Sequence, residues 1–89
     1  MSSYETLKKN IEFQEVYKRG KSYANKYLVM YVLENGTDIT RIGISVSKKV
    51  GNSIVRHRLT RLIREACRLN YGSIQSGYDI VIISRATHK

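Results

Sequence analysis

The sequence has little of several features that mark well-known classes of protein. It holds one cysteine, Cys67, in 89 residues, which excludes a disulfide framework and a cysteine zinc site and favours a reducing compartment. No apolar run approaches the ~18 residues of a membrane-spanning helix, and the first ten residues, MSSYETLKKN, lack the apolar core of a signal peptide. We therefore expect a cytoplasmic protein that binds no membrane.

Acidic residues and histidines are also scarce, which argues against catalysis by the protein itself. A metal-dependent nuclease holds Mg²⁺ with clustered carboxylates, but the seven Asp and Glu residues fall in no D-x-D or E-x-x-D pattern. A metal-free ribonuclease can use two histidines, and only His57, in a basic segment, and His88, in the tail, are present. The sequence therefore predicts no catalytic residue, no metal site and no stand-alone nuclease.

Positive charge is what the sequence has in excess. Sixteen Lys and Arg against seven acids give a formal net charge of +9, which favours polyanionic partners, above all nucleic acid. The charge is densest in residues 45–68, SVSKKVGNSIVRHRLTRLIREACR, where Glu65 is the one acid. The predicted helix in this segment carries Arg and no Lys, and the planar fork of Arg matches phosphate and stacks on bases. This composition indicates RNA or DNA rather than a membrane surface.

Hydrophobic periodicity predicts helices and strands in a single domain over residues 1–89. The strand RIGISVS alternates Ile and Val with small residues, so one of its faces carries little bulk and another segment can lie across it. We expect a helix over about residues 10–19 capped by Asn10, strands at 21–25, 27–33 and 41–47, a helix from Asn52 or Ser53 to about Leu69, and a strand at 78–84. The core-facing side of the second helix is expected to hold Val55, Leu59, Leu62, Ile63, Ala66 and Leu69.

The order α-β-β-β-α-β predicts an α+β two-layer sandwich, with a small mixed four-stranded sheet and the helices on one face. The last strand-helix-strand unit of this order requires a crossover connection, which is normally right-handed. A helix-turn-helix DNA-binding module needs two helices joined by a short turn, whereas strands flank the basic helix here. This order argues against a helix-turn-helix module and so against DNA as the partner.

Aromatic residues gather around the strand face that carries little bulk. Phe13 and Tyr17 share a stripe of the first helix, and Tyr27 and Tyr31 share a strand face with Val29. Single-stranded nucleic acid binds such surfaces by stacking, which contributes about 1–3 kcal/mol per base. The same rings could equally belong to the core, so the pattern alone leaves both interpretations open.

One long segment resembles the signature of a known family. Residues 41–68 read RIGISVSKKVGNSIVRHRLTRLIREACR, which is similar to the basic motif of the bacterial ribonuclease P protein subunit, of the form K-K-x-G-x-A-x-x-R-N-R-x-K-R-x-x-R-E. The matching positions are Lys48, Lys49, Gly51, Asn52, Arg56, Arg58, Arg61, Arg64 and Glu65. The resemblance extends over about residues 7–86. Among the departures from the motif, His57 replaces its middle Asn and Thr60 replaces a basic residue.

The resemblance implies a ribosomal-protein-like fold with a left-handed β-α-β crossover. It also implies a C-terminal helix that is absent here, so we interpret the chain as truncated or naturally short. By resemblance the protein is the non-catalytic component of ribonuclease P, whose catalytic RNA uses Mg²⁺ to cut precursor tRNA and form the mature 5′ end. The protein itself is expected to bind no cofactor, and a ribosomal-type rRNA-binding protein is the alternative.

The resemblance also assigns two sets of contact residues. The expected contacts with the catalytic RNA are Lys48, Lys49, Asn52, Arg56, His57, Arg58, Arg61, Arg64 and Arg68. The expected contacts with the 5′ leader of precursor tRNA are Phe13, Tyr17, Val29, Tyr31, Ser45 and Ser47.

Overall fold

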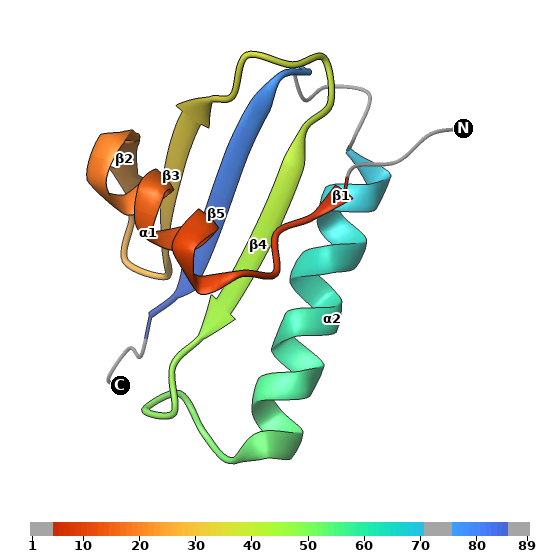
Figure 1. Ribbon diagram of the computed structural model, residues 1–89. Coiled ribbons are helices and arrows are strands. Elements are labelled where there is room, and N and C mark those ends of the chain that lie inside the picture. The colour runs from red at the N-terminus through yellow and green to blue at the C-terminus, as the bar shows by residue number, and fades with distance from the viewer. Residues whose placement is uncertain (1–4, 71–75, 86–89) are drawn as a thin grey trace.

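The chain forms a five-stranded mixed sheet with one helix on each face (Figure 1). The computed structural model describes residues 5–70 and 76–85. The elements are β1 (Glu5–Thr6), α1 (Asn10–Arg19), β2 (Lys21–Ala24), β3 (Leu28–Glu34), β4 (Arg41–Val46), α2 (Ser53–Leu69) and β5 (Tyr78–Ser84). The strands lie in the order β1-β4-β5-β3-β2, and the central strand β5 runs parallel to β4 and antiparallel to β3.

The predicted α+β class is confirmed, but the predicted number of strands is wrong. The sheet has five strands because Glu5 and Thr6 pair in parallel with Arg41 and Ile42 and extend the sheet beyond β4. Two residues are too few to produce an alternating pattern, so this strand left no signal in the sequence. The short strand expected around residues 21–25 is present as β2 and pairs with β3.

The prediction that both helices cover one face of the sheet is also wrong. Successive side chains of a strand point to opposite faces, and both faces of β5 are apolar. Val81 packs with Val16 of α1 on one face. Ile80 and Ile82 pack with Ile63 of α2 on the other. A central strand that is apolar on both faces fits a helix on each side, and the sequence YDIVIIS carries that information.

Helix α1 has the predicted extent, but its capping residue differs from the prediction. Lys9, rather than Asn10, occupies the cap position, and the Glu12 carboxylate accepts the backbone N–H of Lys9 at 3.3 Å. At the other end, a Cβ on Gly20 would lie 2.7 Å from the carbonyl oxygen of Val16 and 2.8 Å from that of Val32. The helix therefore ends in glycine because the backbone of β3 passes too close for any side chain.

Helix α2 has the predicted start, while its predicted core face is partly wrong. The Asn52 side chain accepts the backbone N–H of Val55 at 3.0 Å and caps the helix. Ile63 and Cys67 pack against the sheet, and burial raises the pKa of the Cys67 thiol. In contrast, Leu62 is 60% and Leu69 is 68% exposed.

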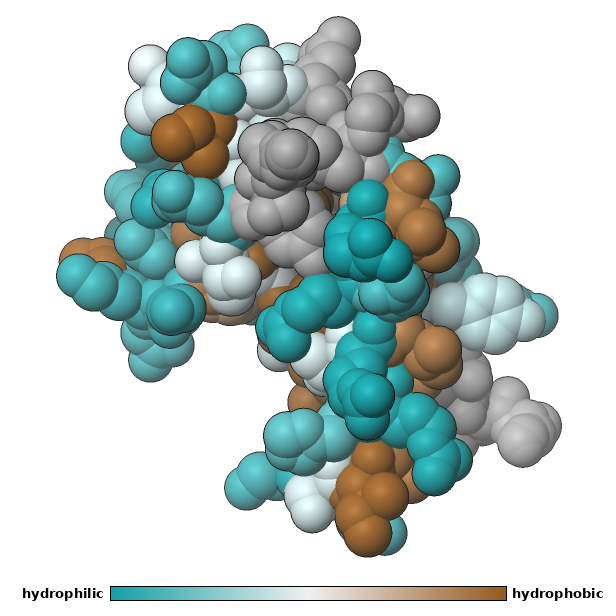
Figure 2. Space-filling model, turned by 90° about the vertical axis from the view of Figure 1, so that its right-hand side faces the viewer, coloured by the Kyte–Doolittle hydropathy of each residue, from teal (hydrophilic) through white to brown (hydrophobic). Residues whose placement is uncertain are grey.

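The physical reason is that α2 packs mainly on β4 and turns Ile63 and Cys67 toward the core of β4 and β5, whereas Leu62 and Leu69 stay exposed on the side of the helix away from that core. Ala66 is exposed as well. Figure 2, which faces the α2 side, shows hydrophilic side chains along the helix with separate hydrophobic patches between them. No helix among the described residues is both long and apolar enough to cross a membrane.

Candidate nucleic-acid interface

On the sheet face that α1 covers, two rows of side chains lead toward the carboxyl ends of β4 and β5. Strand register aligns Tyr31, Val81 and Gly43 in one row across β3, β5 and β4. The next row toward the carboxyl ends of β4 and β5 holds Val29, Ile83 and Ser45. All three are half-buried, and we call the strip that they form beside α1 the leader groove, after the leader contacts that the resemblance predicts here.

Three aromatic rings form a continuous line along one side of the leader groove. Phe13 and Tyr17 meet edge to face with ring centroids 6.4 Å apart, and Tyr17 meets Tyr31 in the same way at 5.2 Å. All three are half-buried against the core of Leu7, Val16 and Val81, so each ring is held in place. Desolvation, together with the neighbouring Tyr31, raises the pKa of the Tyr17 hydroxyl.

Gly43 explains how the ring of Phe13 comes to lie over the sheet. A Cβ at this position would stand 2.5 Å from Cζ of Phe13 and 3.1 Å from Cβ of Leu7. The prediction that another segment lies across the small-residue face of this strand is therefore confirmed at Gly43. Further along the same strand face, Ser45 is half-buried in the groove floor.

The turn between β4 and α2 closes the groove at its lower end. The hydroxyl of Ser47 accepts the backbone N–H of Lys49 at 3.0 Å, and the carbonyl of Ser47 accepts the N–H of Val50 at 3.0 Å. Ser47 thus shapes the turn and points the exposed Lys48 and Lys49 outward. The Asn52 cap follows at once, so two lysines and the start of α2 lie together beside the groove.

The basic residues assigned to α2 do not all have the same surroundings. Arg58, Arg61 and His57 are exposed and lie on the first half of the helix. Arg56 is half-buried, and its Nε donates to the carbonyl of Gly51 at 3.2 Å. Arg68 donates from Nε to Glu65 at 3.2 Å, and this bond lowers the pKa of that carboxyl.

The predicted RNA-binding residues of α2 therefore differ in the contacts that they make within the protein. Arg56 stabilises the turn, Arg68 is held by an ion pair, and Arg64 is exposed with contacts of its own. Thr60, where a basic residue was expected, donates its hydroxyl to the carbonyl of Arg56 at 2.9 Å and so bonds back to its own helix. His57 lies among exposed basic neighbours of the same helix.

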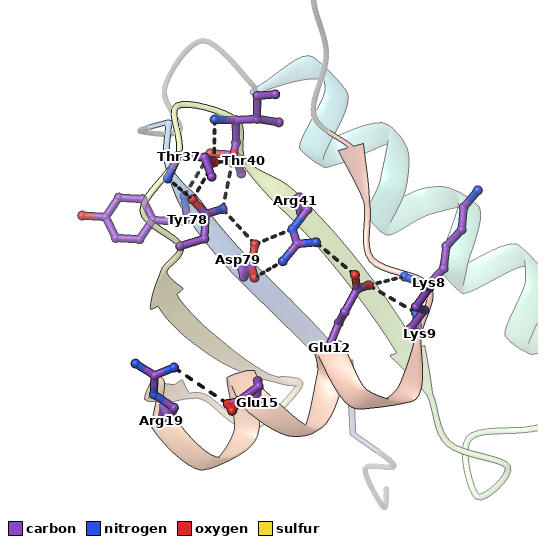
Figure 3. A network of polar contacts seen from close by, with 12 residues as sticks. Lys8, Lys9, Glu12, Glu15, Arg19, Thr37, Thr40, Arg41, Tyr78 and Asp79 are labelled. Carbon is purple, nitrogen blue, oxygen red and sulfur yellow. Dashed lines mark hydrogen bonds and ion pairs between the residues drawn. The ribbon is translucent and has the colours of Figure 1, made fainter.

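A buried ion network, which sequence reasoning missed, fixes α1 over the sheet (Figure 3). Arg41 donates to Asp79 from Nε at 2.8 Å and from Nη2 at 2.6 Å, and its Nη1 donates to Glu12 of α1 at 3.0 Å. Asn35 donates to the same Asp79 carboxylate at 2.9 Å. No spacing in the sequence signalled this contact, because it depends on Arg41 and Asp79, near the starts of β4 and β5, pairing in register.

The network shifts the pKa of both carboxyl groups downward. Burial alone would raise the pKa of Asp79, but the hydrogen bonds from Arg41 and Asn35 outweigh it and lower that pKa. For Glu12, the N–H of Lys9 is the main cause of the lowered pKa, with a further contribution from Arg41. Both groups are therefore ionised at neutral pH and hold α1 by charge.

Charge is separated between the two ends of the sheet. Five of the seven acids lie at or beside the end where β4 and β5 begin: Glu5, Glu12, Glu34, Asp38 and Asp79. Four basic residues lie where β4 and β5 end, namely Lys26, Lys48, Lys49 and Arg85, while Arg41 lies at the acidic end and is paired with Asp79 and Glu12. Within residues 5–70 and 76–85, no three His, Cys, Asp or Glu side chains gather to hold a metal ion.

Comparison with known proteins identifies the family. A family model described as Ribonuclease P matches residues 1–89. The chain belongs to the ribonuclease P family. The ribonuclease P protein component of Lachnoclostridium phytofermentans is 64% identical over 85 residues, which cover 96% of this chain and 73% of that protein.

Solved structures agree with this assignment. The RNase P protein of Staphylococcus aureus superimposes with a TM-score of 0.87 at 42% identity, over 96% of this chain and 77% of that chain. The RNase P protein from Thermotoga maritima gives 0.84 at 42% identity, over 91% and 74%. The ribonuclease P resemblance predicted from residues 41–68 is thus confirmed, together with the fold class. The chain is a protein subunit of ribonuclease P, an RNA-binding component of a tRNA-processing ribonucleoprotein, and the ribosomal-type alternative is not favoured.

Proposed function

We propose that this subunit holds the single-stranded 5′ leader of precursor tRNA in the leader groove while α2 and the preceding turn bind the catalytic RNA. The RNA carries out the cleavage with Mg²⁺ in the cytoplasm, and the protein supplies binding and position. No step of the cleavage is assigned to a side chain of this chain, and the protein binds no cofactor of its own.

The observation that carries this proposal is the line of three aromatic rings beside the leader groove. Tyr17 and Tyr31 meet at 5.2 Å and border a floor that ends in Ser45, so bases without a paired strand can lie flat there. A duplex is too wide to present its base faces to such a strip, whereas unpaired bases stack on aromatic rings. The exposed Lys48 and Lys49 stand at the end of the strip, where a phosphate backbone would leave it.

The basic side of α2 supports the second half of the proposal. Arg58 and Arg61 are exposed on the surface of α2. Together with Leu62 and Glu65 they line one shallow hollow of that surface. Guanidinium groups at helical spacing match phosphates of a folded RNA. Because the groove and this helix surface are separate, one protein can contact two RNA molecules at once.

The test compares two substrates bound to the reconstituted holoenzyme. The Tyr31→Leu variant keeps apolar volume but removes the aromatic face, so affinity for precursor tRNA should fall about tenfold, as expected for the loss of one stacked base. Mature tRNA lacks the leader and should bind as before. The matched control is Tyr23→Leu, because Tyr23 is exposed and pairs with Met30 on the opposite face of the sheet.

Two outcomes would contradict the proposal. If precursor and mature tRNA lose affinity equally, or if neither does, Tyr31 is not part of a leader-binding surface. Cleavage of precursor tRNA by RNA-free protein would show that the protein carries chemistry. Circular dichroism of each variant establishes that it is folded before affinities are compared.

A further inference from the structure

The β2–β3 turn extends the floor of the leader groove by one more row. The pairing of β3 with β5 continues past the strand ends, since Arg85 donates its backbone N–H to the carbonyl of Tyr27 at 2.9 Å. Strand alternation then places Tyr27 on the same face as Val29 and Tyr31. Figure 1 shows this turn, the end of β5 and the β4–α2 turn at the same end of the sheet.

Hydrogen bonds hold this turn in one conformation. The side-chain oxygen of Asn25 accepts the backbone N–H of Tyr27 at 2.7 Å and that of Leu28 at 2.8 Å. The guanidinium of Arg85 reaches across from β5 and donates to the carbonyl of Asn25 at 2.8 Å. The Tyr27 ring is therefore carried by a fixed backbone, so a base that stacks on it meets a prepared surface.

The ring itself is open to solvent and surrounded by positive charge. Tyr27 is 60% exposed, unlike the half-buried rings of the aromatic line. Lys26 places its Nζ over one face of the ring, 5.7 Å from the centroid, so a base would stack on the other face. No residue in the turn segments 25–27 and 47–52 is acidic. An exposed aromatic ring among cations, with no core to fill, is the arrangement that binds unpaired nucleotides.

We propose that the β2–β3 turn is a nucleobase platform, in which the Tyr27 ring stacks an unpaired base of the leader and Lys26 and Arg85 contact the phosphates beside it. The platform rests on the proposed function, because it adds one nucleotide site to the leader groove. It assigns Tyr27 a role separate from that of Tyr31, which packs against the core.

The absence of tryptophan from the chain allows a direct test of stacking. The Tyr27→Trp variant carries a single indole, whose fluorescence a stacked base quenches. We expect quenching when holoenzyme containing this variant is titrated with precursor tRNA, and none with mature tRNA. The matched control is Tyr23→Trp, since Tyr23 is 55% exposed in the same hairpin but lies on the opposite face, and its fluorescence should not change.

An affinity measurement completes the test. The Tyr27→Ala variant should bind precursor tRNA about fivefold to a hundredfold more weakly, the range for one lost stacked base, and should bind mature tRNA normally. If Tyr27→Trp shows no quenching while Tyr31→Leu still weakens precursor binding, the platform is wrong and the leader groove stands. If neither variant responds to the leader, the proposed function fails as well. Quenching by the catalytic RNA alone, before substrate is added, would overturn the assignment of the platform to the leader.

Discussion

Gly43 is the residue on which the shape of the leader groove most depends. It lies in the middle of β4 without a positive φ, so its role is the space that it leaves for the Phe13 ring. Any side chain here would have to displace that ring or Leu7, whose Cβ would be 3.1 Å away. The position of Phe13, and with it one end of the aromatic line, follows from the absence of a single methyl group.

We predict that Gly43→Ala lowers the free energy of unfolding by about 1–3 kcal/mol, because the added methyl group overpacks the face under Phe13. Urea denaturation measures this cost. In a Phe13→Ala background the ring is gone, so the same substitution should cost much less. An equal cost in both backgrounds would show that the strain arises elsewhere than at the Phe13 ring.

At the scale of single residues, the sequence predicted where another segment lies close to a strand but not which charged side chains meet. The small residues of β4 indicated that another segment lies over them, and the Phe13 ring does so at Gly43. Yet nothing in the spacing indicated that Arg41 joins Asp79 and Glu12, since this contact depends on strands 38 residues apart coming into register. The roles of the predicted RNA contacts stay predictions, because they depend on partners that the fold alone does not contain.

Helix α2 is the element with the most positive surface, and its charges can be tested one at a time. Arg61→Ala should reduce the slope of log affinity against log salt, for binding to the catalytic RNA, by about 0.7–0.9, which is the contribution of one phosphate contact. Arg58→Ala should do the same. Filter binding over a series of salt concentrations gives each slope.

The control for lost charge is Arg19→Ala on α1. Arg19 is also exposed and lies 3.8 Å from Glu15, so its removal changes the net charge by the same amount away from α2. A slope that decreases equally in Arg19→Ala and Arg61→Ala would mean that the effect reports total charge rather than a contact. An unchanged slope in both α2 variants would mean that neither arginine touches phosphate.

For α2, the hydrophobic pattern predicted the extent of the helix more reliably than which of its apolar side chains are buried. The start of α2 at Asn52 and its end near Leu69 follow from local chemistry: a cap and an amphipathic repeat. Which apolar side chains are buried depends on which of them face the sheet, and α2 packs chiefly on β4 with Ile63 and Cys67 toward the core of β4 and β5. For this reason Ile63 is covered while Leu62, its neighbour in the same stripe, is not.

The whole molecule should lose stability in acid through the network that ties α1 to the sheet. Asp79 and Glu12 have pKa values below their ordinary ones. Their contribution is therefore fully present above the unfolded-state pKa values of about 4, and is lost as the pH falls through the lower folded-state values. We expect the free energy of unfolding in urea to decrease steadily over that acidic range.

The variant Asp79→Asn tests this prediction. It removes the buried charge, so it should destabilise the protein at pH 7 and flatten the dependence of stability on pH. Asp38→Asn, which changes an exposed carboxylate of the β3–β4 turn, is the matched control and should leave the dependence nearly as steep. If the two variants give the same pH profile, the acid sensitivity does not arise in the Arg41 network.

The separation of charge between the two ends of the sheet has a consequence for how the protein meets its partner. With Asp79 and its acidic neighbours at one end and Lys48, Lys49 and Arg85 at the other, we expect the molecule to carry an electric dipole as well as a net positive charge. In the field of a polyanion such a body turns during its approach, so that the basic end leads before any contact is made. Encounters in the wrong orientation then become rare, and the rate of productive association should exceed what net charge alone would give.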